Sequence, residues 1–425
     1  MYVGRFPPSP GWCCPINEPL AETPLPAATV ARPPRVVDTD DDFVTALEEL
    51  SQGHGPVAVD AERASGFTYS ARAYLIQVSR RGGGTHLFDP VALNDLSPLM
   101  DVIGDEEWIF HAATQDLACL AELGLVPSRI FDTELGSRLL GLPRVGLGTV
   151  VAELLGLHLA KEHSAANWST RPLPEEWLHY AALDVEVLPN LRDAVYERLV
   201  QADKWSIAEQ EFRHLTQWKP APPKAEPWRR MSGLQSVRGQ RNLAIARELW
   251  RARDDFARER DIAPGRVLPE SSIIAAVLAE PTTVNQLASL RQFHGRFSRT
   301  ELPRWWKAIQ DGTTTKDLPA IRGASVGLPN PRNWKDRHPD AFARFTSVRE
   351  ALLAEAEQRD IPVENLLTPD FVRKICWEPP VPADTLAVAA HLTESGARPW
   401  QVEATAWLIA EAITASDDKN PKIEE

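Results

Sequence analysis

The sequence is poor in cysteine and has no long apolar run. Its four cysteines are too few and too scattered for a disulfide framework, and they have no further Cys or His residues at zinc-binding spacing. We therefore expect free thiols without a disulfide partner. They are Cys13, Cys14, Cys119 and Cys376. No run of about 18 apolar residues occurs, and prolines interrupt the first 34 residues, where a signal peptide would need an apolar stretch. These absences predict a cytoplasmic protein with no membrane partner.

Charge is divided unevenly along the chain. At 425 residues, 43% hydrophobic and 25% charged, the composition is that of a globular protein with two or three domains. The net charge of −13 argues against a protein that coats nucleic acid with its whole surface. Residues 36–215 hold 29 Asp and Glu against 13 Lys and Arg, whereas residues 219–266 hold 12 Lys and Arg against 6 Asp and Glu. The two regions should therefore have different roles.

Short β-prone runs and amphipathic stretches follow one another in the acidic region. Three runs with a Gly-rich turn between the last two predict an antiparallel meander. Two later apolar runs each lead into an amphipathic stretch, and further helical patterns follow. The runs are 57–61, 74–79, 85–89, 108–111 and 129–132, and the helical patterns are 114–123, 133–140, 147–155 and 175–199. The expected fold class is α/β, a mixed sheet with flanking helices.

The second half of the chain reads as helix and turn. A segment with too many prolines for a helix or a central strand separates it from the first half. A weak internal repeat relates 259–268 to 358–367, which predicts two related all-α domains. The expected divisions are a disordered arm (1–35), an α/β domain (36–215), a linker (216–227), a helical domain (228–310), a linker (311–329), a second helical domain (330–414) and a disordered tail (415–425).

Two acidic residues, Asp60 and Glu62, stand two positions apart in the first β-prone run. Residues two apart in a strand point to the same face, so both carboxylates should project into one cleft. Oxygen ligands this close favour a hard cation such as Mg²⁺ or Mn²⁺, because without one the like charges repel. Taken alone, such a pair also fits a solvated strand edge.

Two further acids and a tyrosine lie at the ends of later elements. Asp116 falls where an apolar run ends and a helix begins, a place where the helix dipole alone also favours an acid. Tyr180 and Asp184 are four positions apart, so they share one face of a helix. The phenol is then placed to orient a water that a metal bound to Asp184 activates, although Tyr180 also fits a core aromatic residue.

Taken together and in this order, the four acids and the tyrosine resemble the DEDD exonuclease superfamily, in its tyrosine-containing branch, and within it the ribonuclease D family. The resemblance spans about residues 40 to 212 and includes 74–78, 110–112, 131–133, Lys161, 168–173 and 180–185. The helical domains resemble the HRDC domain shared with RecQ-type helicases, the first more clearly than the second. One departure is Asn167, where the family often has an acid.

The resemblance implies a ribonuclease H-like exonuclease domain that releases nucleoside monophosphates from RNA 3′ ends. It implies two divalent metal ions, Mg²⁺ or Mn²⁺, with Asp60 as the bridging ligand. The implied metal ligands are Asp60, Glu62, Asp116 and Asp184. Tyr180 would hydrogen-bond the attacking water, and since a phenol with an ordinary pKa of about 10 is a poor base, the metal must acidify that water.

An acidic catalytic domain needs local features to bind a polyanion. Arg171, beside the helix that carries Tyr180, is expected to contact phosphate in the cleft. Three arginines of the first helical domain are expected to do the same, because arginine offers bidentate phosphate contacts. They are Arg238, Arg241 and Arg247. The arginines that follow them alternate with acids as on any solvated helix face, so both interpretations stay open there.

The expected substrate is RNA, as transfer RNA precursors or other small structured RNA, and this expectation rests on the resemblance. A 3′-to-5′ exonuclease acting on DNA would share the same carboxylates, and similar helical domains accompany DNA helicases. A non-catalytic RNA-binding scaffold with the same fold is the other alternative. The complete set of acids argues against the scaffold.

Overall fold

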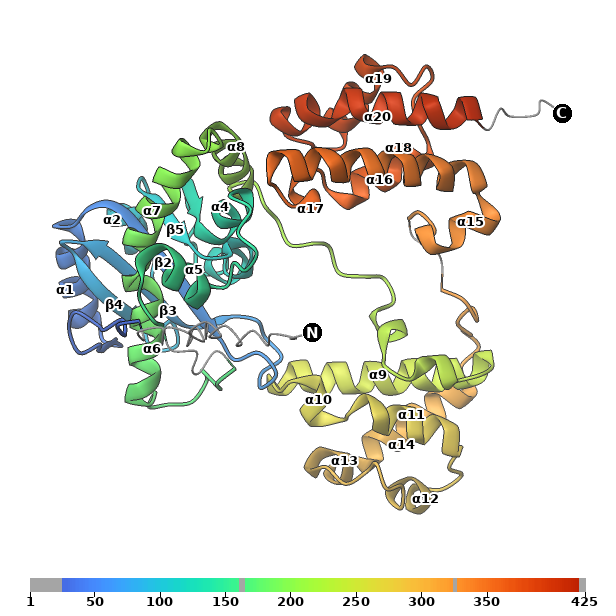
Figure 1. Ribbon diagram of the computed structural model, residues 1–425. Coiled ribbons are helices and arrows are strands. Elements are labelled where there is room, and N and C mark those ends of the chain that lie inside the picture. Colours follow the sequence, from blue (N-terminus) through green and yellow to red (C-terminus); the bar gives the residue numbers. More distant parts are fainter. Residues whose placement is uncertain (1–24, 160–164, 324–326, 420–425) are drawn as a thin grey trace, which may run out of the picture.

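The computed structural model describes residues 25–159, 165–323 and 327–419. Within these ranges a six-stranded mixed sheet with flanking helices is followed by two all-helical units (Figure 1), which confirms the expected fold class. The strands are β1 (Val36–Val37), β2 (His54–Arg63), β3 (Ala73–Arg81), β4 (Gly84–Phe88), β5 (Glu107–Phe110) and β6 (Arg129–Asp132). Among the described helices, none combines the length and the apolar character that a membrane span requires.

The strand order places the predicted acids at one edge of the sheet. The order is β1-β4-β3-β2-β5-β6, in which β2, β3 and β4 form the antiparallel meander that the sequence predicts. Strand β5 runs parallel to β2, and β6 runs parallel to β5. Because the carboxyl ends of parallel strands meet at the same edge, the end of β2 lies beside the turn that follows β5.

Alternation along β2 assigns one set of helices to each face of the sheet. Val57, Val59 and Ala61 are buried in one apolar cluster, and Ala58 is buried in another. The first cluster is completed by α1 (Asp40–Ser51), α2 (Pro98–Ile103) and α3 (Leu117–Ala121). The second is completed by α4 (Thr133–Leu139), α5 (Leu147–Leu155), α7 (Leu188–Gln201) and α8 (Trp205–Leu215), and α6 (Glu175–Glu186) packs against β2, β3 and β4. Since Asp60 is two residues beyond Ala58, it faces α6 and α7.

Two helical patterns are divided where the sequence analysis expected continuous helices. The pattern over 175–199 forms α6 and α7, which meet at Val187. Pro189 explains the break, because proline has no N–H and its ring clashes with the carbonyl four residues earlier. The pattern over 114–123 forms the 3-10 helix η1 (Ala113–Gln115) and then α3, with Asp116 at the junction.

Parts of the expected disordered ends are ordered. In the arm, Ala28 donates a backbone hydrogen bond to His158, and the backbone N–H of Ala31 donates to the carboxylate of Glu186. The expectation of disorder is therefore wrong for residues 25–35, because this segment pairs with the catalytic domain. It is also wrong for the start of the tail, since α20 (Pro399–Lys419) continues past residue 415 and buries Ser416.

The two helical units repeat one arrangement of helices. In each, a long helix ends at an aspartate in the left-handed region, Asp261 with φ of 48° and Asp360 with φ of 50°, and a one-turn helix and a third helix follow. The first unit contains η2 (Pro227–Arg230), η3 (Leu234–Ser236), α9 (Gln240–Arg260), α10 (Pro264–Val267), α11 (Glu270–Ala279), α12 (Val284–Ala288), α13 (Arg296–Thr300) and α14 (Leu302–Thr314). The second contains η4 (Pro331–Asn333), α15 (Trp334–Arg337), α16 (Pro339–Arg359), α17 (Val363–Leu366), α18 (Pro369–Trp377), α19 (Thr385–Glu394) and α20.

The first helical unit docks on the loop between β2 and β3. Asp261 accepts hydrogen bonds from the backbone N–H of Ser70 at 2.7 Å and from the hydroxyl of Tyr74 at 3.2 Å. Arg266 donates to the carbonyl of Gly66 at 2.7 Å. The loop begins directly after β2, the strand that carries Asp60 and Glu62, and the contacted Gly66 and Ser70 follow its last residue within the next seven positions.

The second helical unit docks near α8 and shares an apolar core with the catalytic domain. The carbonyl oxygen of Asp360 accepts from Lys204 at 2.8 Å. The carboxylate of Glu211, which is only 6% exposed, accepts from Arg398 and from the indole of Trp400, both at 2.7 Å. One continuous cluster joins Phe212 with Trp400. The second unit is therefore an extension of the catalytic domain's core rather than a separate body.

Two cysteines are described, and both are buried free thiols, Cys119 in α3 and Cys376 in α18. Cys13 and Cys14 lie outside the described residues, as does Lys161, one of the positions that carried the family resemblance.

Candidate active site

Four acidic side chains from three parts of the fold meet at one edge of the sheet. Asp60 and Glu62 come from β2, Asp116 from the start of α3 and Asp184 from α6. Single oxygens of Asp60, Glu62 and Asp184 lie within 4.8 Å of one another. Asp116 joins this cluster through a side-chain hydrogen bond with Asp60. The structure thus brings together the four acids that the sequence analysis singled out.

Crowding in a poorly solvated cleft raises the pKa values of these acids. Burial, reinforced by the charges of Asp60, Asp184 and Asp116, raises the pKa of Glu62 to about 10. Burial and the charge of Asp60 raise the pKa of Asp184 to about 8. Burial also raises the pKa values of Asp60 and Asp116. Oxygen donors that repel one another in this way are complementary to a divalent cation, which replaces the protons and removes the repulsion.

Tyr180 lies one helical turn before Asp184 and hydrogen-bonds its carboxylate. Burial and the negative charge of Asp184 raise the pKa of Tyr180 above its usual value, so the phenol keeps its proton at neutral pH. The fully buried ring of Trp168 packs beside it, with 6.5 Å between the ring centroids. This packing holds Tyr180 toward the acids as a hydrogen-bond donor.

Asp132, at the end of β6, fixes the turn that carries Asp116. Its carboxylate accepts from the backbone N–H groups of Ala112 at 3.1 Å and Ala113 at 2.8 Å, at the start of η1. It also caps α4 by accepting from the N–H of Glu134 at 2.9 Å. This role of Asp132 was not predicted from the sequence, although an aspartate directly before a helix is a signal for an N-cap.

Arg63 is a second residue that the sequence analysis missed. Its guanidinium lies 3.7 Å from the carboxylate of Asp116, and its positive charge opposes the rise in the pKa values of Asp60, Glu62 and Asp116. Strict alternation would place Arg63 on the opposite face from Glu62. The pairing register of β2 and β3 shifts between these two residues, and such bulges redirect side chains beside active sites. No sequence signal marked this bulge.

Arg171 does not have the role predicted for it. A guanidinium has five N–H donors, and all of them are occupied inside the fold. Two donate to the carboxylate of Asp89, at 2.6 and 2.8 Å. The others donate to the carbonyl oxygens of Tyr74, Trp168 and Thr170. Arg171 therefore ties the loop of Trp168 to the sheet, which contradicts the expected phosphate contact.

The three arginines predicted in the first helical unit have different surroundings. Arg247 is 5% exposed and donates to the carboxylate of Asp317 and to Glu248, so its predicted phosphate contact is also contradicted. Arg238 and Arg241 are exposed near the start of α9. Arg241 donates to the carbonyl oxygen of Thr315 at 2.7 Å. A role for these two in binding nucleic acid stays a prediction.

A mixed sheet that gathers these acids and a tyrosine at one edge defines a class, the 3′-to-5′ exonucleases. Residues 34–199 match the family model described as 3′-5′ exonuclease, and residues 327–413 match the model of the 3′ to 5′ exonuclease C-terminal domain. Residues 242–309 match the HRDC domain. Two different models thus cover the two helical units.

Known proteins narrow this class to one family. Ribonuclease D of Jannaschia sp. is 31% identical over 270 residues, 61% of this chain and 68% of that protein. Ribonuclease D of Gluconacetobacter diazotrophicus is 26% identical over 358 residues, 81% of this chain and 87% of that protein. A crystal structure of a protein from Bifidobacterium adolescentis superimposes with a TM-score of 0.85 at 38% identity, covering 92% of this chain and 100% of that one. The chain belongs to the ribonuclease D family and is a 3′-to-5′ exoribonuclease.

The donor set fits the metal dependence of DEDD exonucleases. The clustered ligands are all carboxylate oxygens, which hard divalent cations prefer. The cluster of Asp60, Glu62 and Asp184 can therefore hold a metal ion at the end of β2.

Proposed function

We propose that this exoribonuclease hydrolyses the 3′-terminal phosphodiester bond with two divalent cations, Mg²⁺ or Mn²⁺, held by Asp60, Glu62, Asp116 and Asp184. The observation that carries the proposal is the approach of oxygens of Asp60, Glu62 and Asp184 to within 4.8 Å of one another. Asp60 interacts with both Asp116 and Asp184, which suits it to the bridging position. When bound, two cations supply an activated water and stabilise the leaving 3′-oxygen.

In the proposed mechanism Tyr180 orients the attacking water and does not deprotonate it. Its raised pKa keeps the phenol protonated at neutral pH, which excludes it as a general base. Its hydrogen bond to Asp184 fixes the hydroxyl beside a metal-binding carboxylate. Arg63 holds Asp116 in the cluster and offsets part of the negative charge that an incoming phosphate would meet.

We assign the substrate to transfer RNA precursors or other small structured RNA. The assignment rests on family membership, since the catalytic carboxylates serve RNA and DNA equally well. Action in the cytoplasm is part of the same proposal. Purified chain incubated with transfer RNA precursors should shorten their 3′ ends to a defined position, which sequencing of the products would detect.

The activity is tested on single-stranded RNA and DNA of the same sequence, each labelled at the 5′ end. In Mg²⁺ the full chain should shorten RNA one nucleotide at a time from the 3′ end, and faster than DNA. Asp60→Ala and Asp184→Asn should abolish the release of mononucleotides. Asp101→Ala, which removes an exposed aspartate from α2, is the control and should leave the rate unchanged. Faster release from DNA would overturn the substrate, and unchanged activity in both site variants would overturn the site.

A further inference from the structure

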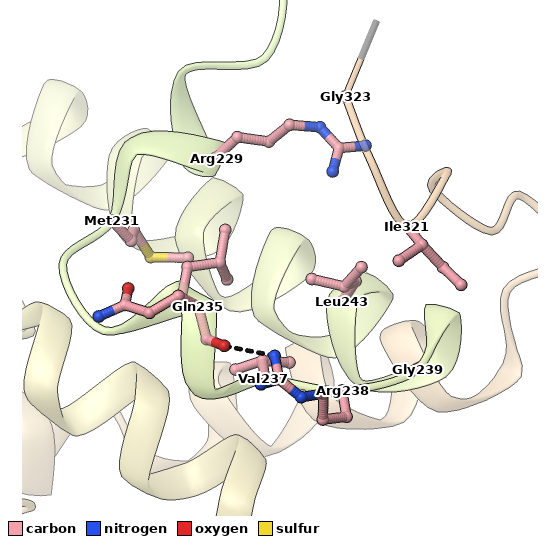
Figure 2. A pocket seen from close by; sticks show the side chains of 10 residues that line it. Arg229, Met231, Gln235, Val237, Arg238, Gly239, Leu243, Ile321 and Gly323 are labelled. Atoms are coloured by element: carbon pink, nitrogen blue, oxygen red, sulfur yellow. Dashed lines mark hydrogen bonds between the residues drawn. The ribbon is translucent and has the colours of Figure 1, made fainter. Parts of the chain in front are cut away.

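A cavity of about 480 Å³ opens at the beginning of the first helical unit (Figure 2). It lies between the segment that leads into α9 and the linker that follows α14, and it is built from two kinds of side chain. Its apolar wall includes Met231, Leu234, Leu243 and Ile321. Figure 2 shows Arg229 extending toward Gly323 at one end of the cavity and Arg238 lying beside Gln235 at the opposite end.

Both guanidinium groups are held in place at the cavity. Arg229 donates to the carboxylate of Glu226 at 2.6 Å and to the carbonyl of Ala320 at 3.0 Å, and it stacks 4.3 Å from the ring of Trp228. Arg238 is exposed and donates to the carbonyl of Gln235. A guanidinium presents five N–H donors in one plane, so an arginine bonded to protein can still bind a phosphate.

The charge of this cavity differs from that of two other cavities in the molecule. Among the described residues that line it, none is acidic. In the other two, basic residues are matched by acidic ones. One is lined by Arg32 with Glu49 and Glu186, and the other by Arg129 and Arg213 with Glu107 and Glu209. The cavity at α9 therefore combines an apolar wall with two guanidinium groups, of which Arg229 is paired with Glu226 outside the lining and Arg238 has no acidic partner among the described residues.

We propose that this cavity binds an unpaired nucleotide of the RNA substrate, with the base against the apolar wall and its phosphate beside Arg229 or Arg238. An unpaired base can leave the stack and expose its face to apolar and guanidinium groups, whereas a paired base cannot. The basic balance of residues 219–266 is complementary to the polyanion. The proposal rests on the proposed function, because it takes the RNA to be the strand whose 3′ end lies among the four acids.

The length of α9 sets where along the strand this nucleotide falls. The helix has 21 residues and is therefore about 30 Å long. Its last turn ends at Asp261, which contacts the loop after β2, and its first turn lies at the cavity. The bound nucleotide thus belongs to the body of the RNA, several residues before the 3′ end. A trinucleotide in the active site is too short to reach it.

The test compares Arg238→Glu with Arg230→Glu in the full chain. Both replace an exposed arginine of the same segment and change the net charge equally, but Arg230 does not line the cavity. Affinity for an unpaired RNA 20-mer, measured without divalent metal, should fall about tenfold or more for Arg238→Glu and much less for Arg230→Glu. Ile321→Asp should give a similar loss, and since Ile321 is 69% exposed the substitution is compatible with folding.

Two further readouts separate this site from the active site. For Arg238→Ala the slope of log affinity against log salt should decrease by about 0.7, the value for one lost phosphate contact on a single strand. Hydrolysis of a trinucleotide should be unchanged, while KM for the 20-mer rises. Equal losses for Arg238→Glu and Arg230→Glu, a loss on the trinucleotide, or an equal loss with duplex RNA would overturn the proposal. Failure of the proposed function would appear differently, as unprocessed RNA with the parent chain.

Discussion

Replacing Asp184 with asparagine removes an ionisable group that the fold disfavours in its charged form. Its pKa of about 8 lies far above the ordinary value of 3.8 that it regains in the unfolded chain. Between these values the folded protein holds a proton that the unfolded chain releases, so rising pH favours unfolding. The penalty is absent below about pH 4 and grows until about pH 8. Burial and the neighbouring charge of Asp60 are its causes.

The size of the effect follows from the two pKa values. Each pH unit between them corresponds to about 1.4 kcal/mol, so Asp184 destabilises the metal-free protein by about 2 kcal/mol at pH 5 and about 5 kcal/mol at pH 7.5. Asparagine has the same shape and does not titrate, and its carbonyl can still accept from Tyr180. Asp184→Asn should therefore be inactive and yet raise the free energy of unfolding by up to these amounts.

Thermal unfolding in EDTA at pH 5 and pH 7.5 measures this prediction. The midpoint of Asp184→Asn should exceed that of the parent chain, with the larger gain at pH 7.5. Mg²⁺ in excess should stabilise the parent more than the variant, because ligands stabilise the state that binds them. The exposed control Asp101→Asn should show no such gain at either pH. A variant less stable than the parent at pH 7.5 would refute the view that the four acids repel one another.

Four other expectations follow from the described contacts. Tyr180→Phe should lower kcat by up to about 100-fold with metal affinity unchanged, because the water loses its orienting hydroxyl; an equal loss of metal affinity would contradict this. The pKa of Glu62 is raised to about 10, so Mg²⁺ must displace its proton in order to bind. The Mg²⁺ concentration for half-maximal activity should therefore fall as pH rises from about 6 to about 8. Asp261→Ala should release the first helical unit and increase the radius of gyration measured by small-angle scattering. Glu211→Ala should lower the free energy of urea unfolding by about 3 to 5 kcal/mol, since it leaves Arg398 unpaired in a buried site.

The sequence predicted best what depends on local pattern. The strand around Asp60 follows from alternation, and the shared helix face of Tyr180 and Asp184 follows from their spacing. The meander was predictable because its turn residues are adjacent in sequence. The break between α6 and α7 was also predictable, since Pro189 marks it, but the apolar periodicity around it suggested one helix.

Contacts between distant segments were beyond the reach of sequence patterns. Arg171 looks like a phosphate ligand until the fold brings Asp89, 82 residues away, to its guanidinium. Arg247 pairs with Asp317 across the first helical unit for the same reason. Arg63 enters the site only because a bulge shifts the register of β2. In each case the deciding partner is set by tertiary structure rather than by neighbours in the chain.

The aspartates at the ends of α9 and α16 give the catalytic domain two contacts of unequal strength with the helical units. Separating the contact at Asp360 would expose the apolar core that the second unit shares with α8, so this separation has a hydrophobic cost. The contact at Asp261 consists mainly of hydrogen bonds, to Ser70 in the loop after β2 and to Tyr74 at the start of β3, which water can replace. Because linkers tether the first unit, its local concentration keeps even this weak contact mostly formed. The second unit thus stays bound to the catalytic domain, whereas the first unit can detach and rebind.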